Sequence, residues 1–228
     1  MALATSTAPF IVFGYGSLIY KPPPHVVAQD DLQSAPGSLM LCAVSGFLKG
    51  YVRRFAQKSH DHRGTPQSPG RVVTLVHKED WDLFSGSDPF PNEDIVWGVA
   101  YTIDPEFEAD VRAYLDYREK DGYTMETMPI YNIVDGAETI IIPNAHCYVG
   151  RKDNPSFLGS EPLAALAHRI WVSVGPSGPN KEYLYNLADA VRHLSPNSVD
   201  HHLFTLEVRV VHSVLIQQSL THKNYVHV

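Results

Sequence analysis

The amino-acid sequence predicts an α+β fold, a small mixed β-barrel-like sheet with flanking helices and a helical C-terminal part. Two observations predict this fold. Short segments rich in β-branched and aromatic residues, which are typical of strands, fill most of the first 150 residues. Segments with helical periodicity occupy most of the remaining chain. This order favours a sheet with helices packed against it over an alternating α/β fold.

Composition and charge limit the kinds of partner. The chain has 228 residues, 44% of them hydrophobic and 19% charged, which suits a single globular domain over residues 1–228. A formal net charge of −7 disfavours a nucleic-acid partner. No apolar run approaches the roughly 20 residues of a membrane span, so we expect no membrane association.

The start of the chain and the cysteines indicate the compartment. The N-terminal segment lacks the basic region that opens a signal peptide. The two cysteines, Cys42 and Cys147, are too few for a disulfide framework, and we expect both to be buried thiols. Together these features predict a cytoplasmic protein.

The first predicted strand ends in a turn with two glycines. Residues 10–13 form a short apolar run, and Gly14 and Gly16 follow it. A dinucleotide-binding fingerprint would need a third glycine at position 19 and then a helix. Ile19 stands there instead, and residues 22–24 are all proline, which forbids a helix soon afterwards. The turn therefore does not predict a nucleotide site.

The remaining elements follow in chain order from composition and turn signals. Loops are predicted at residues 21–38, 60–70 and 79–94, the last of them acidic. A helix is predicted to begin at Asp104–Pro105 and to end near Lys120, before Asp121–Gly122. The other predicted elements are extended segments within 38–56, broken by Gly46 and Gly50; strands at 71–76, 95–103, 123–134 and 138–150; and helices near 161–173, 181–194 and 200–219.

One carboxylate occupies an unusual position in the first predicted helix. Val111, Leu115 and Glu119 are spaced four residues apart and therefore share one helix face, flanked by Phe107 and Tyr114. Glu119 thus extends an apolar stripe at the helix C-terminus, where the macrodipole disfavours a negative charge. Either a basic neighbour pairs with this carboxylate, or burial raises its pKa and makes it a general base. The spacing alone leaves both interpretations open.

The glycine turn offers a complement to such a base. Gly14 and Gly16 permit unusual backbone angles and can expose successive amides, which suit a carboxylate or an oxyanion. The alternative is a tight bend in a barrel that binds nothing. Ser17 is not expected to be a nucleophile, because Tyr15 and Ile19 stand where a nucleophile elbow requires glycine.

Two histidine clusters and a further glycine turn are weaker signals. The clusters, at residues 60–62 and 200–202, lack the i, i+4 spacing of a helical metal site, so we expect no metal. The turn at 174–180 precedes a helix and can bind an anion, but a plain connection between helices is the preferred interpretation.

Six stretches spread over most of the chain carry a family pattern. They are "VFGYGSLIYKP" (12–22), "RRFAQKSHDHRGTPQSPGRVVTLV" (53–76), "VWGVAY" (96–101), "AYLDYREKDGY" (113–123), "YVGRKDNPSFLG" (148–159) and "GPSGPNKEYL" (175–184). Together they resemble the ChaC family, the glutathione-specific γ-glutamylcyclotransferases. Two loops, about 28–42 and 79–94, look longer than the compact family pattern and leave the details of substrate access open.

The resemblance implies a γ-glutamylcyclotransferase-like fold, no cofactor, and glutathione as the small-molecule partner. It implies a lyase that cyclises glutathione to 5-oxo-L-proline and L-cysteinylglycine, with Glu119 as general acid and base. Two alternatives stay open: a broader γ-glutamyl-peptide or γ-glutamylamine cyclotransferase, and a non-catalytic γ-glutamyl-binding module. The implied substrate loop consists of Gly14, Tyr15, Gly16, Ser17, Leu18 and Ile19.

Two further residues are expected to bind the substrate. Arg71 stands at a strand start, where its planar fork suits the γ-glutamyl α-carboxylate or a protein carboxylate such as Glu119. A solvated arginine is the alternative for this position. Tyr183 lies in a stretch of the resemblance that a generic γ-glutamyl site would not require. We therefore expect it on the Cys-Gly side, together with His60, His62 and Arg63.

Overall fold

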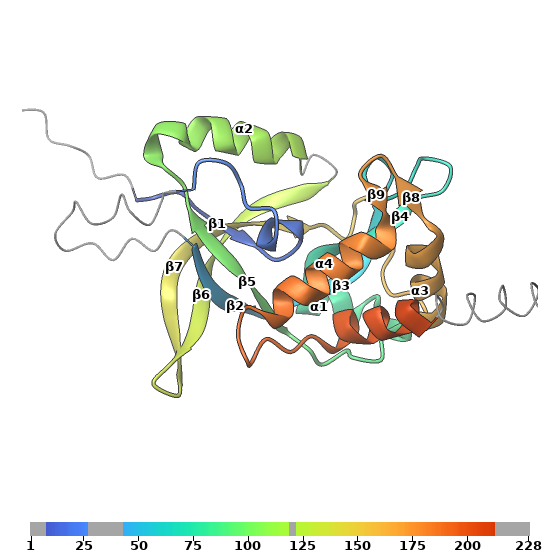
Figure 1. Cartoon of the computed structure of the whole chain (residues 1–228). Coiled ribbons are helices and arrows are strands. Elements are labelled where there is room, and N and C mark those ends of the chain that lie inside the picture. The colour runs from blue at the N-terminus through green and yellow to red at the C-terminus, as the bar shows by residue number, and fades with distance from the viewer. Residues whose placement is uncertain (1–7, 27–42, 119–121, 213–228) are drawn as a thin grey trace, which may run out of the picture.

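Five strands close into a mixed barrel in the computed structural model, which describes residues 8–26, 43–118 and 122–212 (Figure 1). The strand order is β1–β5–β2–β6–β7, with β1 parallel to β7 and antiparallel to β5. This confirms the predicted α+β fold with a small mixed barrel. The barrel strands are β1 (Ile11–Gly14), β2 (Ala43–Lys49), β5 (Ile95–Thr102), β6 (Tyr123–Val134) and β7 (Ala137–Gly150).

A separate two-stranded sheet stands beside the barrel. It consists of β3 (Tyr51–Ser59) and β4 (Gly70–His77), which pair antiparallel and are joined by the predicted loop. The sequence predicts extended structure in both segments but not that they stay out of the barrel. Val52, Ala56 and Val76 bury one face of this sheet against Trp81.

The helix predicted to begin at Asp104–Pro105 begins and packs as its sequence predicts. The Asp104 carboxylate accepts a hydrogen bond from the Glu106 amide at 2.9 Å and caps a 3-10 turn, after which α2 (Glu108–Arg118) begins. Val111 and Leu115 are fully buried against the barrel, so the apolar stripe is confirmed as far as Leu115. Glu119 lies outside the described residues.

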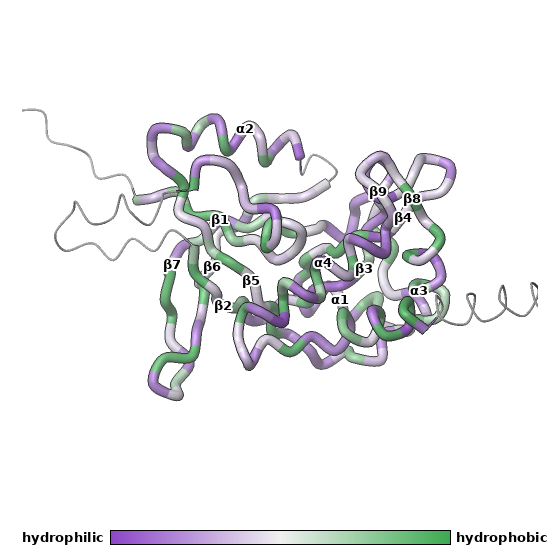
Figure 2. The backbone as a smooth tube through the Cα atoms, in the orientation of Figure 1, coloured by the Kyte–Doolittle hydropathy of each residue, from purple (hydrophilic) through white to green (hydrophobic). Residues whose placement is uncertain are grey.

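Helices dominate the C-terminal part, as predicted. They are α3 (Leu163–Val172), α4 (Asn180–Arg192) and a C-terminal helix described over residues 201–212, with the short ribbon β8 (Val174–Gly175) and β9 (Gly178–Pro179) between α3 and α4. Figure 1 places these helices around β3 and β4, away from α2. Figure 2 shows hydrophobic stretches along β5, β7 and α3, and one buried core joins the barrel to these helices.

Two local predictions are wrong. The acidic segment 79–94 is not all loop, because α1 (Lys78–Asp82) and a 3-10 turn (Ser85–Ser87) form within and beside it. The burial of Trp81, whose indole donates to Asp88 at 2.7 Å, explains this order. Gly46 does not break β2 but lies inside it. Its lack of a side chain serves packing instead, because a Cβ there would stand 2.5 Å from an Ile130 methyl. Gly50, with φ +79°, does form the break between β2 and β3.

Some predictions fall on residues that the structure leaves undescribed. These are the loop 28–42 with Cys42, the helix end at Lys120–Asp121, and the last part of the predicted helix 200–219. Cys147 is buried and is a thiol rather than part of a disulfide, as predicted. None of the helices in the described ranges has the length and apolar character needed to cross a membrane.

Candidate active site

A pocket of about 440 Å³ lies where the turn after β1 meets the two-stranded sheet, the end of α2 and the start of α4. Its walls include Gly14–Leu18, Gln57–Ser59, Val72–Val73 and Tyr183. This volume falls within the range of about 300–1,000 Å³ that is usual for small-molecule sites. The chain therefore holds a preformed cavity at the turn that the sequence singles out.

The turn is a 3-10 helix over Ser17–Ile19 that closes on itself. The Ile19 amide donates to the Gly16 carbonyl at 3.0 Å, and the Lys21 amide donates to the Ser17 carbonyl at 2.8 Å. These bonds leave the amides of Gly16 and Ser17 outside the hydrogen bonding of the turn itself. The predicted loop residues from Gly14 to Leu18 line the pocket, whereas Ile19 does not.

The two glycines leave space for close packing, and Gly16 also has an unusual backbone conformation. Neither has a positive φ. A Cβ on Gly14 would stand 2.6 Å from the Cβ of Leu18, and one on Gly16 would stand 3.2 Å from a Val73 methyl. Gly16 nevertheless adopts φ −119° and ψ −132°, outside the usual α and β regions, as the sequence leads us to expect. The close contacts add a requirement for small residues, which keeps this part of the wall open.

The end of α2 supplies a second wall. Tyr114, Tyr117 and Arg118 line the pocket, and the two tyrosines form its exposed rim. The Arg118 guanidinium donates a hydrogen bond to the Ser17 hydroxyl, so the helix and the turn are joined. Glu119 follows Arg118 directly in the sequence, and its placement lies beyond what the structure describes.

The described wall is strongly cationic. Lys21, Lys58, Arg63 and Arg118 line it together with a single carboxylate, Asp61. Such an excess of positive charge attracts an anionic ligand. The wall therefore suits a ligand with carboxylate groups.

Arg63 is the most buried of these cations, at 6% exposure. Its guanidinium donates to the Pro179 carbonyl at 3.0 Å and lies over the Tyr183 ring, 5.9 Å from the ring centroid. Arg63 and Tyr183 therefore hold one another in place at the wall. The same Nη1 atom also lies 3.8 Å from the carboxylate of Glu182, which is exposed.

Tyr20 lies beside the turn with an unusual hydroxyl. Its ring lines the pocket, and its oxygen is buried without a hydrogen-bond partner among the residues that the structure describes. Burial raises the pKa of Tyr20 to about 12, although Arg63 and Arg118 act to lower it. The hydroxyl therefore stays protonated at neutral pH, and a ligand that offers an acceptor would satisfy it.

Arg71 is a predicted site residue that the structure does not bring to the pocket wall. Its guanidinium donates to both carboxylate oxygens of Glu161, at 2.5 and 3.1 Å, and to the carbonyls of Pro69 and Gly70. Arg71 does face a protein carboxylate, as one of the interpretations expects, but that carboxylate belongs to Glu161. Its contribution to substrate binding stays a prediction.

The histidine clusters have partners of other kinds. His62 lines the pocket and contacts the Ser177 hydroxyl at 3.2 Å, whereas His60 contacts Ser156 at 3.3 Å, away from the wall. The short ribbon that carries Ser177 thus reaches the pocket rim, beyond its role as a connection between helices. Within the described ranges, no three histidine, cysteine or acidic side chains gather as metal ligands would.

The sequence interpretation missed most of the aromatic wall. Tyr20, Tyr114, Tyr117, Tyr123 and Tyr148 line the pocket from four segments of the chain. One signal was present, since Tyr114 and Tyr117 are three residues apart and share a helix face. The other tyrosines meet them only through closure of the barrel.

Comparisons with known proteins agree with this geometry. Residues 10–213 match the family model described as ChaC-like protein. The glutathione-specific γ-glutamylcyclotransferase of Schizosaccharomyces pombe is 43% identical over 199 residues, which cover 87% of this chain and 91% of that protein. Its namesake from Saccharomyces cerevisiae is 36% identical over 209 residues, covering 79% of this chain and 84% of that protein.

A solved structure resembles the chain over nearly its whole length. It is a selenomethionine-labelled γ-glutamyl cyclotransferase specific to glutathione from yeast, with a TM-score of 0.71 and 32% identity. The match covers 90% of this chain and 96% of the yeast chain. With the family match over residues 10–213, it leads to one conclusion: the chain belongs to the ChaC-like protein family.

Proposed function

We propose that this protein is a glutathione-specific γ-glutamylcyclotransferase, a lyase that converts glutathione to 5-oxo-L-proline and L-cysteinylglycine. One observation carries the proposal: the glycine turn, the cationic wall and the end of α2 converge on a single pocket. The names of the relatives support the same substrate. Glutathione carries a carboxylate at each end, and cations at several points of the wall suit such a ligand.

The reaction needs little from the protein because the nucleophile is internal. The α-amino nitrogen of the γ-glutamyl group attacks its own γ-carbonyl carbon and closes a five-membered lactam. The amide bond to cysteine then breaks, and the proton removed from the attacking nitrogen is returned to the departing cysteine nitrogen. The protein has to hold the folded conformer and stabilise the oxyanion, and no cofactor is required.

Three groups have distinct roles in this proposal. Glu119 is the general acid and base, and its position in the sequence directly after Arg118, which lines the pocket, supports this role. The amides of Gly16 and Ser17 are the donors for the oxyanion or the γ-glutamyl carboxylate. Both lie in the pocket wall and outside the hydrogen bonds of the turn. Lys58, Arg63 and Arg118 supply positive charge for the carboxylates of the substrate.

Discrimination between substrates has to come from the Cys-Gly half. The γ-glutamyl half is common to all γ-glutamyl compounds, so the turn cannot separate them. Arg63, Tyr183 and His62 are the candidate contacts to the glycine carboxylate. Loss of one charged contact of this kind costs about 1.5–3 kcal/mol, or one to two decades in kcat/KM.

The deciding experiment measures products and selectivity together. Purified protein is incubated with glutathione, γ-Glu-Ala or γ-Glu-ε-Lys, and 5-oxoproline is quantified for each. We expect product from glutathione and at least tenfold lower kcat/KM, roughly 1.4 kcal/mol, for the others. Values within about threefold of each other, under roughly 1 kcal/mol, would support the broader cyclotransferase. Binding without product would support the non-catalytic module.

The proposal also specifies conditions and compartment. Because lactam closure by an internal amine needs no Lewis acid, exhaustive treatment with EDTA should leave the rate unchanged. Loss of activity that zinc or manganese restores would contradict this mechanism. We also place the enzyme in the cytoplasm, because the buried Cys147 is a thiol rather than part of a disulfide. We expect it to act as one domain without nucleic acid.

A further inference from the structure

A buried ion pair joins β3 to the C-terminal helix. Arg53 is 2% exposed and Asp200 is 8% exposed, and the Nε and Nη2 atoms of Arg53 contact the Asp200 Oδ2 atom at 2.8 and 2.7 Å. The Asp200 Oδ1 atom accepts a hydrogen bond from the Leu203 amide at 2.8 Å and caps the helix. Both carboxylate oxygens are therefore engaged.

Asp200 is ionised in this environment. Burial alone would raise the pKa of its carboxyl, but Arg53 and the Leu203 amide favour the charged form, and the pKa falls below its ordinary value. The pair is thus a true ion pair at neutral pH. It holds the Arg53 guanidinium in one orientation, since the fork is planar.

The third nitrogen of this guanidinium reaches the candidate active site. Arg53 Nη1 donates to the Tyr15 carbonyl at 3.0 Å and to the Trp97 carbonyl of β5 at 2.8 Å. Tyr15 lies in the turn that lines the pocket, whereas Arg53 is not part of the pocket wall. Arg53 therefore supports the turn from behind and ties it to the barrel.

A carbonyl held in this way also fixes the next amide. The Tyr15 carbonyl and the Gly16 N–H belong to one planar peptide unit, and none of the described peptide bonds is cis. In a trans peptide unit the N–H points opposite to the carbonyl oxygen. With the Tyr15 oxygen bound to Arg53, the Gly16 N–H points away from Arg53, and Tyr15 and Gly16 both line the pocket.

We propose that Arg53 and Asp200 are positioning residues for the reaction, which hold the Tyr15–Gly16 peptide so that the Gly16 N–H faces the substrate. The inference rests on the proposed function for its kinetic consequence, but its structural part can be measured without substrate. Neither residue touches the substrate in this proposal. They act through the backbone of the turn.

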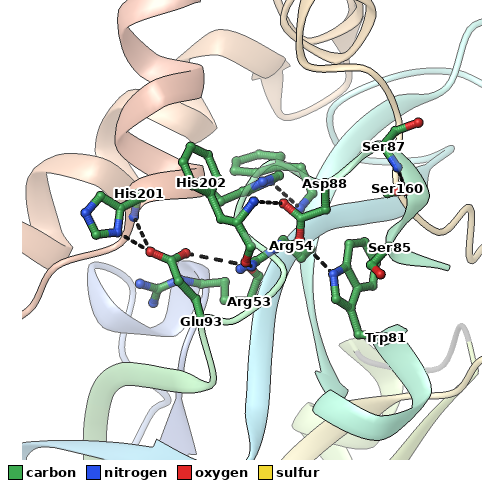
Figure 3. A network of polar contacts seen from close by, with 12 residues as sticks. Arg53, Arg54, Trp81, Ser85, Ser87, Asp88, Glu93, Ser160, His201 and His202 are labelled. Carbon is green, nitrogen blue, oxygen red and sulfur yellow. Dashed lines mark hydrogen bonds and ion pairs between the residues drawn. The ribbon is translucent and has the colours of Figure 1, made fainter. Parts of the chain in front are cut away.

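A second buried ion pair beside the first offers a matched control. Arg54 and Asp88 form this pair, with Nε–Oδ2 at 2.8 Å and side chains 2% and 1% exposed (Figure 3). Arg54 also donates to the Phe90 carbonyl, and Asp88 accepts from the Trp81 indole. This pair resembles the first in chemistry and burial, but it fastens the segment 81–90 rather than the turn. Arg54 also donates to the Arg53 backbone carbonyl at 2.9 Å and lies 3.7 Å from Glu93, and neither contact involves the Arg53 guanidinium that holds the turn.

The kinetic experiment compares Asp200→Asn with Asp88→Asn. Asparagine keeps the shape of each side chain and can still accept from the Leu203 amide, but its neutral amide no longer fixes Arg53. Initial rates of 5-oxoproline formation are measured at a temperature where both variants are folded. We expect Asp200→Asn to lower kcat/KM about 10- to 100-fold and Asp88→Asn to change it less than twofold, although both lower the melting temperature.

A second variant guards against failure to fold. Arg53→Lys keeps the buried charge beside Asp200, but an ammonium cannot span Asp200, Tyr15 and Trp97 as the planar fork does. It should lower kcat/KM in the same way. Wild-type kinetics in Asp200→Asn or Arg53→Lys, or an equal loss in Asp88→Asn, would overturn the proposal.

Amide hydrogen exchange separates this inference from the proposed function. The amides of Ile19, Tyr20 and Lys21 are protected by the turn. Asp200→Asn should speed their exchange at least tenfold, and Asp88→Asn should leave it unchanged. If wild-type protein releases no 5-oxoproline, the proposed function fails. The exchange rates still show whether Asp200 stabilises the turn. Unchanged exchange in Asp200→Asn refutes the positioning role whatever the activity.

Discussion

Arg118 at the end of α2 donates a hydrogen bond to the hydroxyl of Ser17 in the turn after β1. The two residues are 101 positions apart in the sequence, and both line the pocket. A ligand in the pocket therefore meets two elements that are already fastened to one another. This contact makes the end of α2 part of the site rather than a neighbour of it.

Glu119→Gln should lower turnover of glutathione by about 10²- to 10⁴-fold, because the amide cannot accept the proton of the attacking amine. Binding of glutathione and the melting temperature should change little, since the amide keeps the shape of the side chain. Steady-state kinetics and titration calorimetry measure the two effects.

The matched control for this variant is Glu108→Gln in the first turn of the same helix. Glu108 pairs with Arg112 at 2.9 Å on the partly exposed side of α2. Its loss should leave turnover within about twofold. Near-wild-type kcat in Glu119→Gln would falsify the acid–base role, and a large loss of melting temperature would favour a structural ion pair instead.

Tyr20→Phe should separate binding from stability. The Tyr20 hydroxyl is buried without a partner in the described part of the chain, so its removal should not lower the melting temperature. We expect the substrate to accept a hydrogen bond from this hydroxyl, so kcat/KM should fall about tenfold. Tyr101→Phe is the contrast for stability, since its hydroxyl donates to the Leu18 carbonyl at 2.8 Å and its loss should cost about 1 kcal/mol. A Tyr20→Phe enzyme with unchanged kcat/KM would remove Tyr20 from the site.

Arg71 variants should report mainly on stability. Arg71→Met leaves Glu161 without its bidentate partner, which should lower the free energy of unfolding by about 1–3 kcal/mol. Arg71→Lys should retain part of this energy, because an ammonium keeps the charge without the planar fork. The KM for glutathione and the melting temperature are compared in both variants. A tenfold rise in KM with an unchanged melting temperature would instead place Arg71 on the substrate.

The stability of the fold should depend on His202 in mild acid. Burial lowers the pKa of His202 to about 4, and Arg54 adds to this effect, whereas an unfolded histidine titrates near pH 6.5. Between these values the unfolded chain binds a proton that the folded chain excludes. The free energy of unfolding should therefore fall, by roughly 3 kcal/mol, as pH is lowered from about 6.5 to 4.

Urea denaturation at a series of pH values tests this dependence. His202→Gln should flatten the slope in that window, whereas His193→Gln, at an exposed position, should not. Asp88 and Asp200 also act on His202, but the pKa values of both carboxyls are lowered. Their contribution to the free energy of unfolding is therefore lost only at more acidic pH. A slope that persists in His202→Gln would assign the acid sensitivity to another group.

Local signals in the sequence predict the elements that carry short-range information. The apolar run before Gly14 and Gly16 defines a strand and a turn within about ten residues. The spacing of Val111 and Leu115 predicts the buried face of α2 in the same way. Both predictions agree with the structure because neighbours along the chain decide them.

Long-range partners are beyond such patterns. Arg71 is recognisable as a cation that faces a carboxylate, but its partner Glu161 lies 90 residues away. Similarly, no local signal excludes β3 and β4 from the barrel, since strand order depends on which edges meet when the chain closes. Tyr20, Tyr123 and Tyr148 line one wall for the same reason.

The distance between Arg53 and Asp200 along the chain has a consequence for synthesis on the ribosome. The two residues are 147 positions apart. At roughly 5–20 residues per second, Arg53 emerges about 7–30 s before its counter-ion exists. A guanidinium without its partner resists burial, so β3 cannot settle against the turn during that interval. The pocket of the nascent chain is therefore completed late. A chain released before Asp200 is synthesised would not cyclise glutathione.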